Sequence, residues 1–269
     1  MRAIFRVAKA TFHEAWRRRF LNTILVFAIL IIGCSWVFAY LQPGAELKMI
    51  IDVSLGSIRF FGMLIAVFMG TRMIPDEIEK RTIHTILAKP VSRAQFLVGK
   101  FLGGIATIFV NVLLMGLAFV LVYSIKAPQF KTLAEGAMSM DFMFPNIVKA
   151  IILSFFELSV LMAIAVTAST VFSWIIAAIF SFFVYFVGQM SEFFNQLANP
   201  EREIPQIAKL LLGVIYKLLP HFEIFDIREA IMKDIPVPWE VMGKITAQGL
   251  AYALIVILIG YLAFNEREV

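Results

Sequence analysis

Long runs of apolar residues, separated by short groups of charged residues, dominate the pattern of this chain. A helix needs about 20 apolar residues to cross about 30 Å of hydrocarbon. Three runs without Asp, Glu, Lys or Arg meet that length, namely Phe20 to Ala45, Phe101 to Ile125 and Ile245 to Asn265. Each of these runs predicts a membrane-spanning helix.

Two further regions bring the predicted number of spans to six. The run Leu158 to Ser191 is too long for one span, and with Pro145 to Glu157 added it predicts two spans joined by a turn near Ala168-Ser169-Thr170. The stretch Val53 to Thr71 is apolar and glycine-containing but carries Arg59. Small residues favour close helix contact in lipid, so this stretch also predicts a membrane-spanning helix.

The predicted fold class is an all-α integral membrane protein with six transmembrane helices, forming one domain over residues 1–269. Its predicted parts are an N-terminal amphipathic helix at 1–19, spans at 20–41, 53–72, 93–125, 146–168, 172–191 and 245–265, a cytoplasmic helix at 75–89, and an extracytoplasmic segment at 192–244. Pro205 and Pro220 bracket a mostly apolar stretch too short to span, which predicts a re-entrant or interfacial helix, and His221 to Asp234 forms a second amphipathic piece.

Composition and charge support this class and orient the chain. Hydrophobic residues make up 61% of the 269 residues and charged residues 16%, which excludes an ordinary soluble enzyme. The net charge of +5 could suggest nucleic acid, but basic residues gather at 1–19 and 72–100, as the positive-inside rule predicts for cytoplasmic segments. We therefore expect no nucleic-acid partner and a multi-pass protein of the plasma or inner membrane with both termini in the cytoplasm.

The first 19 residues predict a helix that lies on the membrane surface. At about 100° per residue, Ile4, Ala8 and Ala15 share one face, and Arg6 and Arg17 share the other. A basic leader with chance periodicity is the alternative. Processing at the single cysteine, Cys34, is disfavoured because the apolar run continues beyond it.

The loop after the second span has helix start and stop signals. Pro75 suits a first helical turn followed by acidic residues, and Pro90 ends the helix. Ser92 and Gln95 have the spacing of a capping box for the next helix. This pattern predicts a short amphipathic helix suited to passing force from a soluble partner, although a solvated connecting loop fits the periodicity as well.

Three runs in and near this loop resemble a known family. Phe61 to Gly70, Glu77 to Arg93 and Gly99-Lys-Phe-Leu-Gly103 resemble the signature of type-2 ABC-transporter permeases, in the branch that includes the nitrous oxide reductase maturation permease, and Leu218 to Arg228 reinforces the match. The resemblance implies that 1–19 is an elbow helix, that 75–89 is a coupling helix docked on an ATPase, and that two six-span permeases assemble with two ATPase subunits. The coupling residues it implies are Glu77, Glu79, Arg81, Thr82, His84 and Thr85.

The chain lacks the motifs of an ATPase or a metalloprotease. Gly99-Lys100 is followed by Phe101 and is not part of a phosphate-binding loop, and His13-Glu14 does not continue into a zinc motif. We therefore expect no catalytic residue, no metal and no cofactor in this chain, with ATP and Mg²⁺ bound by a separate ATPase. The other expected partners are a second copy or a paralogous permease, the lipid bilayer, and an extracytoplasmic protein if one exists.

Three polar residues inside the predicted spans are candidates for a substrate path: Glu157, Asn111 and Arg59. Glu157 lies deep in the membrane and should be neutral, paired or facing a wet cavity. Arg59 lies nearer the outer surface, where it could snorkel or pair with Asp52. For Asn111, mid-span in the third predicted span, a hydrogen bond to another helix is expected rather than contact with a substrate.

The pattern and the resemblance together predict the permease subunit of an ABC exporter driven by a separate ATPase. The alternative is a mechanotransmitting membrane scaffold that uses the same ATPase and moves no substrate. An ATP-independent channel would leave the 75–89 run unexplained. Nothing in the sequence identifies the substrate.

Overall fold

The computed structural model describes residues 2–41, 43–79, 92–131, 140–197, 213, 216, 219–233 and 235–266. Within these ranges the regular elements are helices, and no strand occurs. The elements are α1 (Arg2–Arg17), α2 (Arg19–Ala39), α3 (Glu46–Arg72), α4 (Pro75–Glu79), α6 (Arg93–Lys131), α7 (Met140–Val171), α8 (Trp174–Gln189), α9 (Ser191–Leu197), the 3₁₀ helix η1 (Phe222–Phe225), α11 (Arg228–Met232) and α12 (Trp239–Glu266). The predicted all-helical fold class is confirmed for the described part of the chain.

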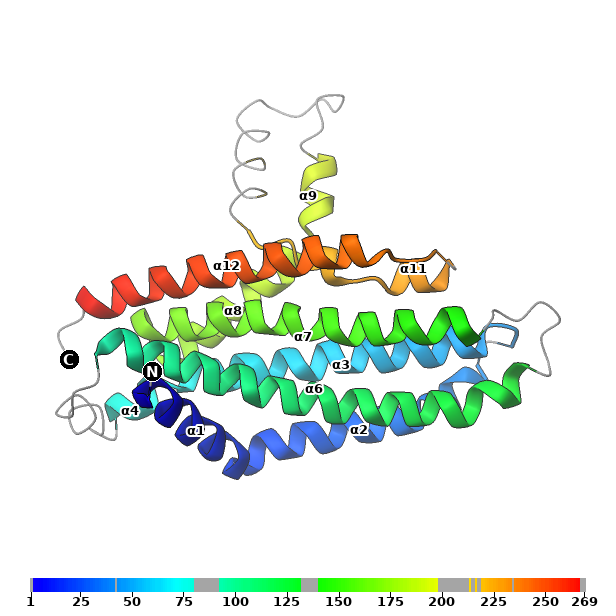
Figure 1. Cartoon of the computed structure of the whole chain (residues 1–269), viewed down its shortest axis with the longest axis horizontal. Helices are drawn as coiled ribbons and strands as arrows, with labels where there is room; N and C mark the ends of the chain where they lie inside the picture. Colours follow the sequence, from blue (N-terminus) through cyan, green and yellow to red (C-terminus); the bar gives the residue numbers. More distant parts are fainter. Residues whose placement is uncertain are drawn as a thin grey trace.

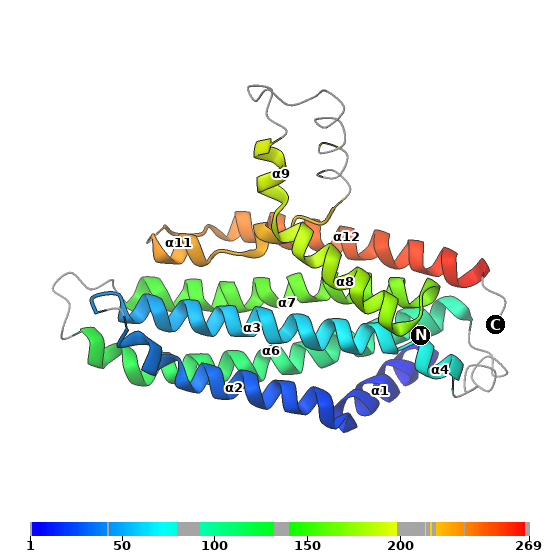
Figure 2. The same ribbon diagram turned by 180° about the vertical axis from the view of Figure 1, so that it is seen from behind.

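Long helices lie side by side in an elongated bundle (Figures 1 and 2). Helices α3 and α7 form its centre, because 67% and 72% of their apolar windows are buried, compared with 28% for α2 and for α12. The outer helices therefore keep wide apolar faces exposed, as expected for contact with lipid or with another membrane subunit. Both termini and α4 lie at the same end of the bundle (Figure 1); we call this the terminal end.

Five described helices are long and apolar enough to cross a membrane: Arg19–Ala39, Glu46–Glu79, Arg93–Lys126, Met143–Val171 and Trp239–Glu266. The one predicted span without a long helix is the fifth, 172–191, which corresponds to α8 with only 16 residues. At 1.5 Å per residue α8 is about 24 Å long, less than the roughly 30 Å of a hydrocarbon core. The six-span layout therefore does not follow from helix length alone.

The break between α7 and α8 falls later than the sequence predicts. Helix α7 continues through Ala168-Ser169-Thr170 to Val171, and the chain turns at Phe172 and Ser173. The Ser169 and Thr170 hydroxyls donate to the carbonyls of Val166 and Thr167. Polar side chains at the predicted turn are thus satisfied within the helix, which removes their turn-forming effect.

Helix α3 also starts earlier than predicted. It begins at Glu46 rather than 53, so most of the expected outer loop is helical and Asp52 lies within α3. At the other end α3 is followed almost directly by α4, which begins at Pro75 as the sequence predicts. The rest of the predicted 75–89 helix lies outside the described residues.

The predicted capping box at the start of α6 is confirmed. The backbone N–H of Gln95 donates to Ser92 Oγ at 3.2 Å, and the backbone N–H of Ser92 donates to Gln95 Oε1 at 3.3 Å. These two bonds satisfy donors that a helix start otherwise leaves unpaired. They fix the point at which the chain re-enters the bundle.

Helix α1 packs against the first turns of α6 through two glycines. A Cβ on Gly99 would lie 2.7 Å from Val7 Cβ, and a Cβ on Gly103 would lie 2.6 Å from Thr11 Cβ and 2.7 Å from the Ala8 carbonyl oxygen. The two backbones approach closely because Gly99 and Gly103 lie four residues apart on one face. The segment from Gly99 to Gly103 therefore forms the surface on which α1 packs.

Replacing Gly103 with leucine should displace α1 and lower the thermal unfolding midpoint of the purified protein. Overpacking of this kind costs about 1–3 kcal/mol. The matched control is Gly33→Leu, because no atom lies within 4 Å of a Cβ at Gly33. Equal shifts for the two variants in a detergent melting experiment would contradict the close α1–α6 contact.

Candidate functional site

A group of buried polar and charged side chains lies within the bundle. We call Arg59, Glu157, Tyr185, Gln189 and Asp226 the buried charge cluster. They come from α3, α7, α8 and the link between η1 and α11. Arg59 and Glu157 each lie about 20 Å along their helix from its terminal end, at 1.5 Å per residue, so α3 and α7 bring them to one level.

Glu157 and Arg59 form a bidentate ion pair at the centre of this cluster. Arg59 Nε donates to Glu157 Oε2 and Arg59 Nη2 donates to Glu157 Oε1, both at 2.8 Å. Glu157 is 0% exposed and Arg59 is 6% exposed. Of the three states predicted for Glu157, the structure has the paired one. Arg59 stays inside the bundle, so the alternative in which it snorkels to the outer surface is wrong.

Two side chains of α8 complete the shell around Glu157. Tyr185 Oη donates to Glu157 Oε1 at 3.1 Å, and Gln189 Nε2 donates to the same oxygen at 2.8 Å. The sequence analysis missed both residues. Their signal was the spacing of four residues, which places two polar side chains on one face of an otherwise apolar helix.

Asp226 links the cluster to the segment that follows η1. Arg59 Nη1 donates to Asp226 Oδ2, and Arg228 Nη2 donates to the same carboxylate at 2.7 Å. Arg228 Nη1 also donates to Asp52 Oδ1 at 3.0 Å. The predicted pairing of Asp52 with Arg59 is therefore wrong: Arg228 binds Asp52, and Arg59 turns inward to Glu157.

The charges of the extended network are nearly balanced. Two guanidinium groups face three carboxylates. Burial opposes ionisation of Asp226, but hydrogen bonds from Arg228 and the positive charge of Arg59 outweigh it and hold the pKa of the Asp226 carboxyl below its usual value. Asp226 is thus a carboxylate at neutral pH and anchors its segment to α3.

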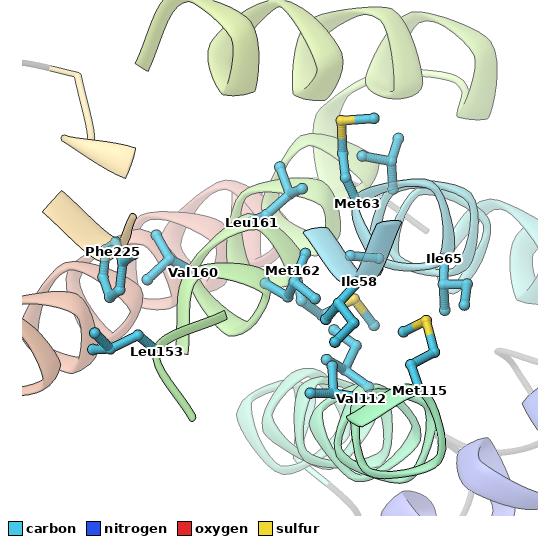
Figure 3. Close-up of a cluster of buried hydrophobic side chains, with 14 of the residues drawn as sticks. Ile58, Met63, Ile65, Val112, Met115, Leu153, Val160, Leu161, Met162 and Phe225 are labelled. Atoms are coloured by element: carbon cyan, nitrogen blue, oxygen red, sulfur yellow. The ribbon is translucent and has the colours of Figure 1, made fainter. Parts of the chain in front are cut away.

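Buried apolar side chains from α3, α6 and α7, together with Phe225, form a cluster in the bundle (Figure 3). Ile58 on α3, Val160 on α7 and Phe225 beside Asp226 are among the buried residues there. The Phe225 ring fits against Gly249 of α12, where a Cβ would lie 2.7 Å from the ring. In such surroundings an unpaired charge is expensive, which favours the bidentate geometry.

The end of α8 meets the segment after it at about the same level. The rings of Tyr185 and Phe222 meet at a tilt of 46° with their centroids 5.2 Å apart, and Glu223 accepts hydrogen bonds from the Ser191 hydroxyl and the Glu192 N–H. The apolar helix α8 therefore stops beside the buried charge cluster, and η1 packs against its end. Figures 1 and 2 show α9 leaving the bundle at this point.

A second charged group joins three elements at the terminal end. We call Glu14, Arg18, Asp76, Glu77 and Lys100 the α1–α4–α6 junction. Arg18 donates to Glu14 at 2.8 Å and to Asp76 at 2.6 Å, and Lys100 donates to Glu77 at 2.7 Å. Lys100 is only 4% exposed, so its pair with Glu77 is largely shielded from solvent. Sequence reasoning missed Arg18, Asp76 and Lys100 as partners.

The remaining predicted site residues divide as follows. Glu77 and Glu79 lie in α4, and Glu79 is exposed. Arg81, Thr82, His84 and Thr85 lie outside the described residues. Asn111 is buried and donates to the Thr107 carbonyl of its own helix α6 at 2.8 Å, so this bond joins no second helix. Among the described residues no three His, Cys, Asp or Glu side chains gather as metal ligands.

A bundle with five described helices long and apolar enough to cross a membrane is typical of a multi-pass membrane protein, and comparisons with known proteins narrow this class to a transporter family. The family model described as ABC-2 family transporter protein matches residues 7–269, and the chain belongs to this family. It is similar to the probable ABC transporter permease protein NosY of Stutzerimonas stutzeri, with 31% identity over 140 residues. The alignment covers 51% of this chain and 48% of NosY, about half of each protein.

Proposed function

We propose that this chain is the permease subunit of an ABC exporter, driven by a separate ATPase and working as a pair of permeases. Family membership supports the class, and the α1–α4–α6 junction is the observation that carries the mechanism. Helix α4 is held by ion pairs to α1 and α6 and runs almost directly into α3. A push on α4 therefore reaches three helices at once.

Helix α3 connects the junction to the buried charge cluster. Asp76 and Arg59 are separated by about 25 Å of nearly continuous helix. A rigid helix transmits displacement along its length, so movement of α4 shifts Arg59 relative to Glu157 on α7. In this mechanism the cluster is the element that has two arrangements and that the ATPase biases.

The short fifth span, α8, supports a substrate path beside the cluster. Both termini lie at one end of the bundle, which requires an even number of crossings, and α8 added to the five long helices gives six. Helix ends and irregular backbone inside a membrane are tolerated where they are buried in protein or line a cavity. We place the path next to Glu157 and Arg59, with α8, η1 and α11 as its outer part.

We further propose the orientation given by the basic residues, with both termini, α1 and α4 in the cytoplasm. Helix α1 then acts as the elbow at the cytoplasmic surface, and α4 with the residues after it forms the coupling helix. Exposed Glu79 points to the partner ATPase in this scheme. ATP and Mg²⁺ are bound by that subunit.

Affinity purification of the tagged chain from its native membrane in mild detergent tests this function. The expected result is co-purification of an ABC ATPase at a one-to-one ratio with the permease. Glu79→Lys should lower that ratio by roughly fivefold, which corresponds to about 1 kcal/mol. The control Glu229→Lys changes an exposed acid in α11 and should leave the ratio unchanged.

Recovery of intact permease without any ATPase would contradict the proposal. A complex that hydrolyses ATP but moves no lipid, peptide or small solute in a vesicle screen would instead favour the mechanotransmitting scaffold.

A further inference from the structure

A cavity at the terminal end of the bundle borders the α1–α4–α6 junction, and the mechanism above assigns it no ligand. It lies where α1 meets α2 and faces the end of α3, with a volume of about 440 Å³. Four arginines line it, Arg17, Arg18, Arg19 and Arg72. We call it the arginine pocket. Its volume falls within the range typical of small-ligand sites.

The arginine pocket carries an excess of positive charge. Arg18 is neutralised by Glu14 and Asp76, which also line the pocket. Arg17 and Arg19 are exposed and form no ion pair with any residue that the structure describes. Two guanidinium groups therefore remain available for an anion, and arginine is well suited to phosphate oxygens.

Arg72 adds a third cation to the pocket. Its guanidinium lies over the Trp174 ring at 4.2 Å from the ring centroid. This stacking holds the side chain in place, and among the residues that the structure describes no carboxylate pairs with its N–H donors. The pocket is thus partly preorganised for an anion rather than neutralised by the protein itself.

One wall of the pocket is apolar and lies at the membrane boundary. Phe20 and Phe68 meet edge to face with ring centroids 5.3 Å apart, and both line the cavity. The spanning helix α2 begins at Arg19 and α3 ends at Arg72. An anionic headgroup at the arginines would therefore place its attached chains beside the aromatic pair and the hydrocarbon.

We propose that the arginine pocket binds the phosphate headgroup of an anionic phospholipid, with Arg17, Arg19 and Arg72 on the phosphate and Phe20 and Phe68 beside the acyl chains. The lipid would lie against α1 and the Arg18–Asp76 bond, and so would stabilise the junction that holds α4. The inference goes beyond the proposed function, because the binding requires neither an ATPase nor a transported substrate.

The chemistry of the site is shared by a free phosphate, so the experiment separates the two sources. Delipidated protein is titrated with phosphatidylglycerol, with phosphatidylcholine of the same acyl chains, and with inorganic phosphate, and bound lipid is counted by native mass spectrometry. We expect phosphatidylglycerol to bind at least tenfold more tightly than phosphatidylcholine, and inorganic phosphate not to displace it. The preference follows from basic side chains near an anionic headgroup, each of which strengthens binding severalfold.

Variants locate the site on the protein. The double substitution R17Q/R19Q should abolish the preference for phosphatidylglycerol, while R2Q/R6Q removes the same charge from exposed positions of α1 that do not line the pocket. Both pairs are exposed, so the thermal midpoint should not change. Equal binding of the two lipids, or an equal loss in the two double variants, would overturn the proposal. Displacement of the lipid by inorganic phosphate would also overturn it, by assigning the site to a free anion.

Discussion

Replacing Glu157 with glutamine should destabilise the protein by about 3–5 kcal/mol, the cost of leaving one partner of a buried ion pair without its counter-charge. Glutamine keeps the size of the side chain but presents one amide NH₂ group toward Arg59 and the α8 donors. Arg59 would retain only Asp226, which Arg228 already binds. The thermal unfolding midpoint should fall by on the order of 10 °C.

A charge-free double variant separates stability from function at this site. Arg59→Met with Glu157→Leu removes both charges, and such replacements of buried pairs are often neutral or stabilising. The double variant should therefore melt close to the wild-type midpoint. It should nevertheless lose ATP-driven movement, because the cluster would no longer have two arrangements for α3 to select.

The control for these variants is Glu229→Gln, which removes an exposed ion pair with Lys233. Exposed pairs contribute about 0–1 kcal/mol, so its midpoint should stay near wild type. An unchanged midpoint for Glu157→Gln would contradict the claim that removing one partner leaves Arg59 as an unpaired buried charge. A double variant that retains full ATP-driven movement would remove the cluster from the mechanism.

Reversing the charge of Lys100 should uncouple the ATPase. Lys100→Glu places a third carboxylate beside Glu77 and Glu14, at a position that is only 4% exposed. Repulsion in this shielded site should push α4 away from α6. We expect ATP hydrolysis stimulated by the permease to fall roughly tenfold or more, as for a broken buried pair.

The charge-swapped variant E77K/K100E provides the specific test of this contact. It restores opposite charges at the same two positions and should recover most of the lost stimulation. The control is Lys233→Glu, which reverses the same charge at an exposed position and should have little effect. If the swap fails to recover stimulation while the complex still assembles, the Lys100–Glu77 contact is not a coupling element.

The parts of the fold that depend on local sequence could be predicted. The capping box at Ser92 and Gln95 and the start of α4 at Pro75 follow from residues within a few positions of each other. The long spans follow from uninterrupted apolar runs. The short length of α8 could not be read from its run, because an apolar stretch does not reveal where a helix stops inside the membrane.

The candidate site could be predicted only in part, because its contacts join distant segments. Hydropathy alone singled out Arg59 and Glu157, but their pairing spans 98 positions and depends on how α3 and α7 are registered. Asp226 was missed because its segment was read as an outer amphipathic piece. Lys100 stood out only as one of the basic residues at 72–100, and its burial against Glu77 depends on how α4 packs on α6.

The central claim is that a separate ATPase moves the membrane helices of this chain, and the single native cysteine allows its most direct test. Cys34 is exposed on α2, about 20 Å along that helix from the terminal end. One spin label per copy on Cys34, in a complex with a cysteine-free ATPase, gives one distance between the two permeases by pulsed electron paramagnetic resonance. We predict that the distance distribution shifts by more than its width between the nucleotide-free and the vanadate-trapped ATP states. An unchanged distribution in a complex that hydrolyses ATP would contradict the account.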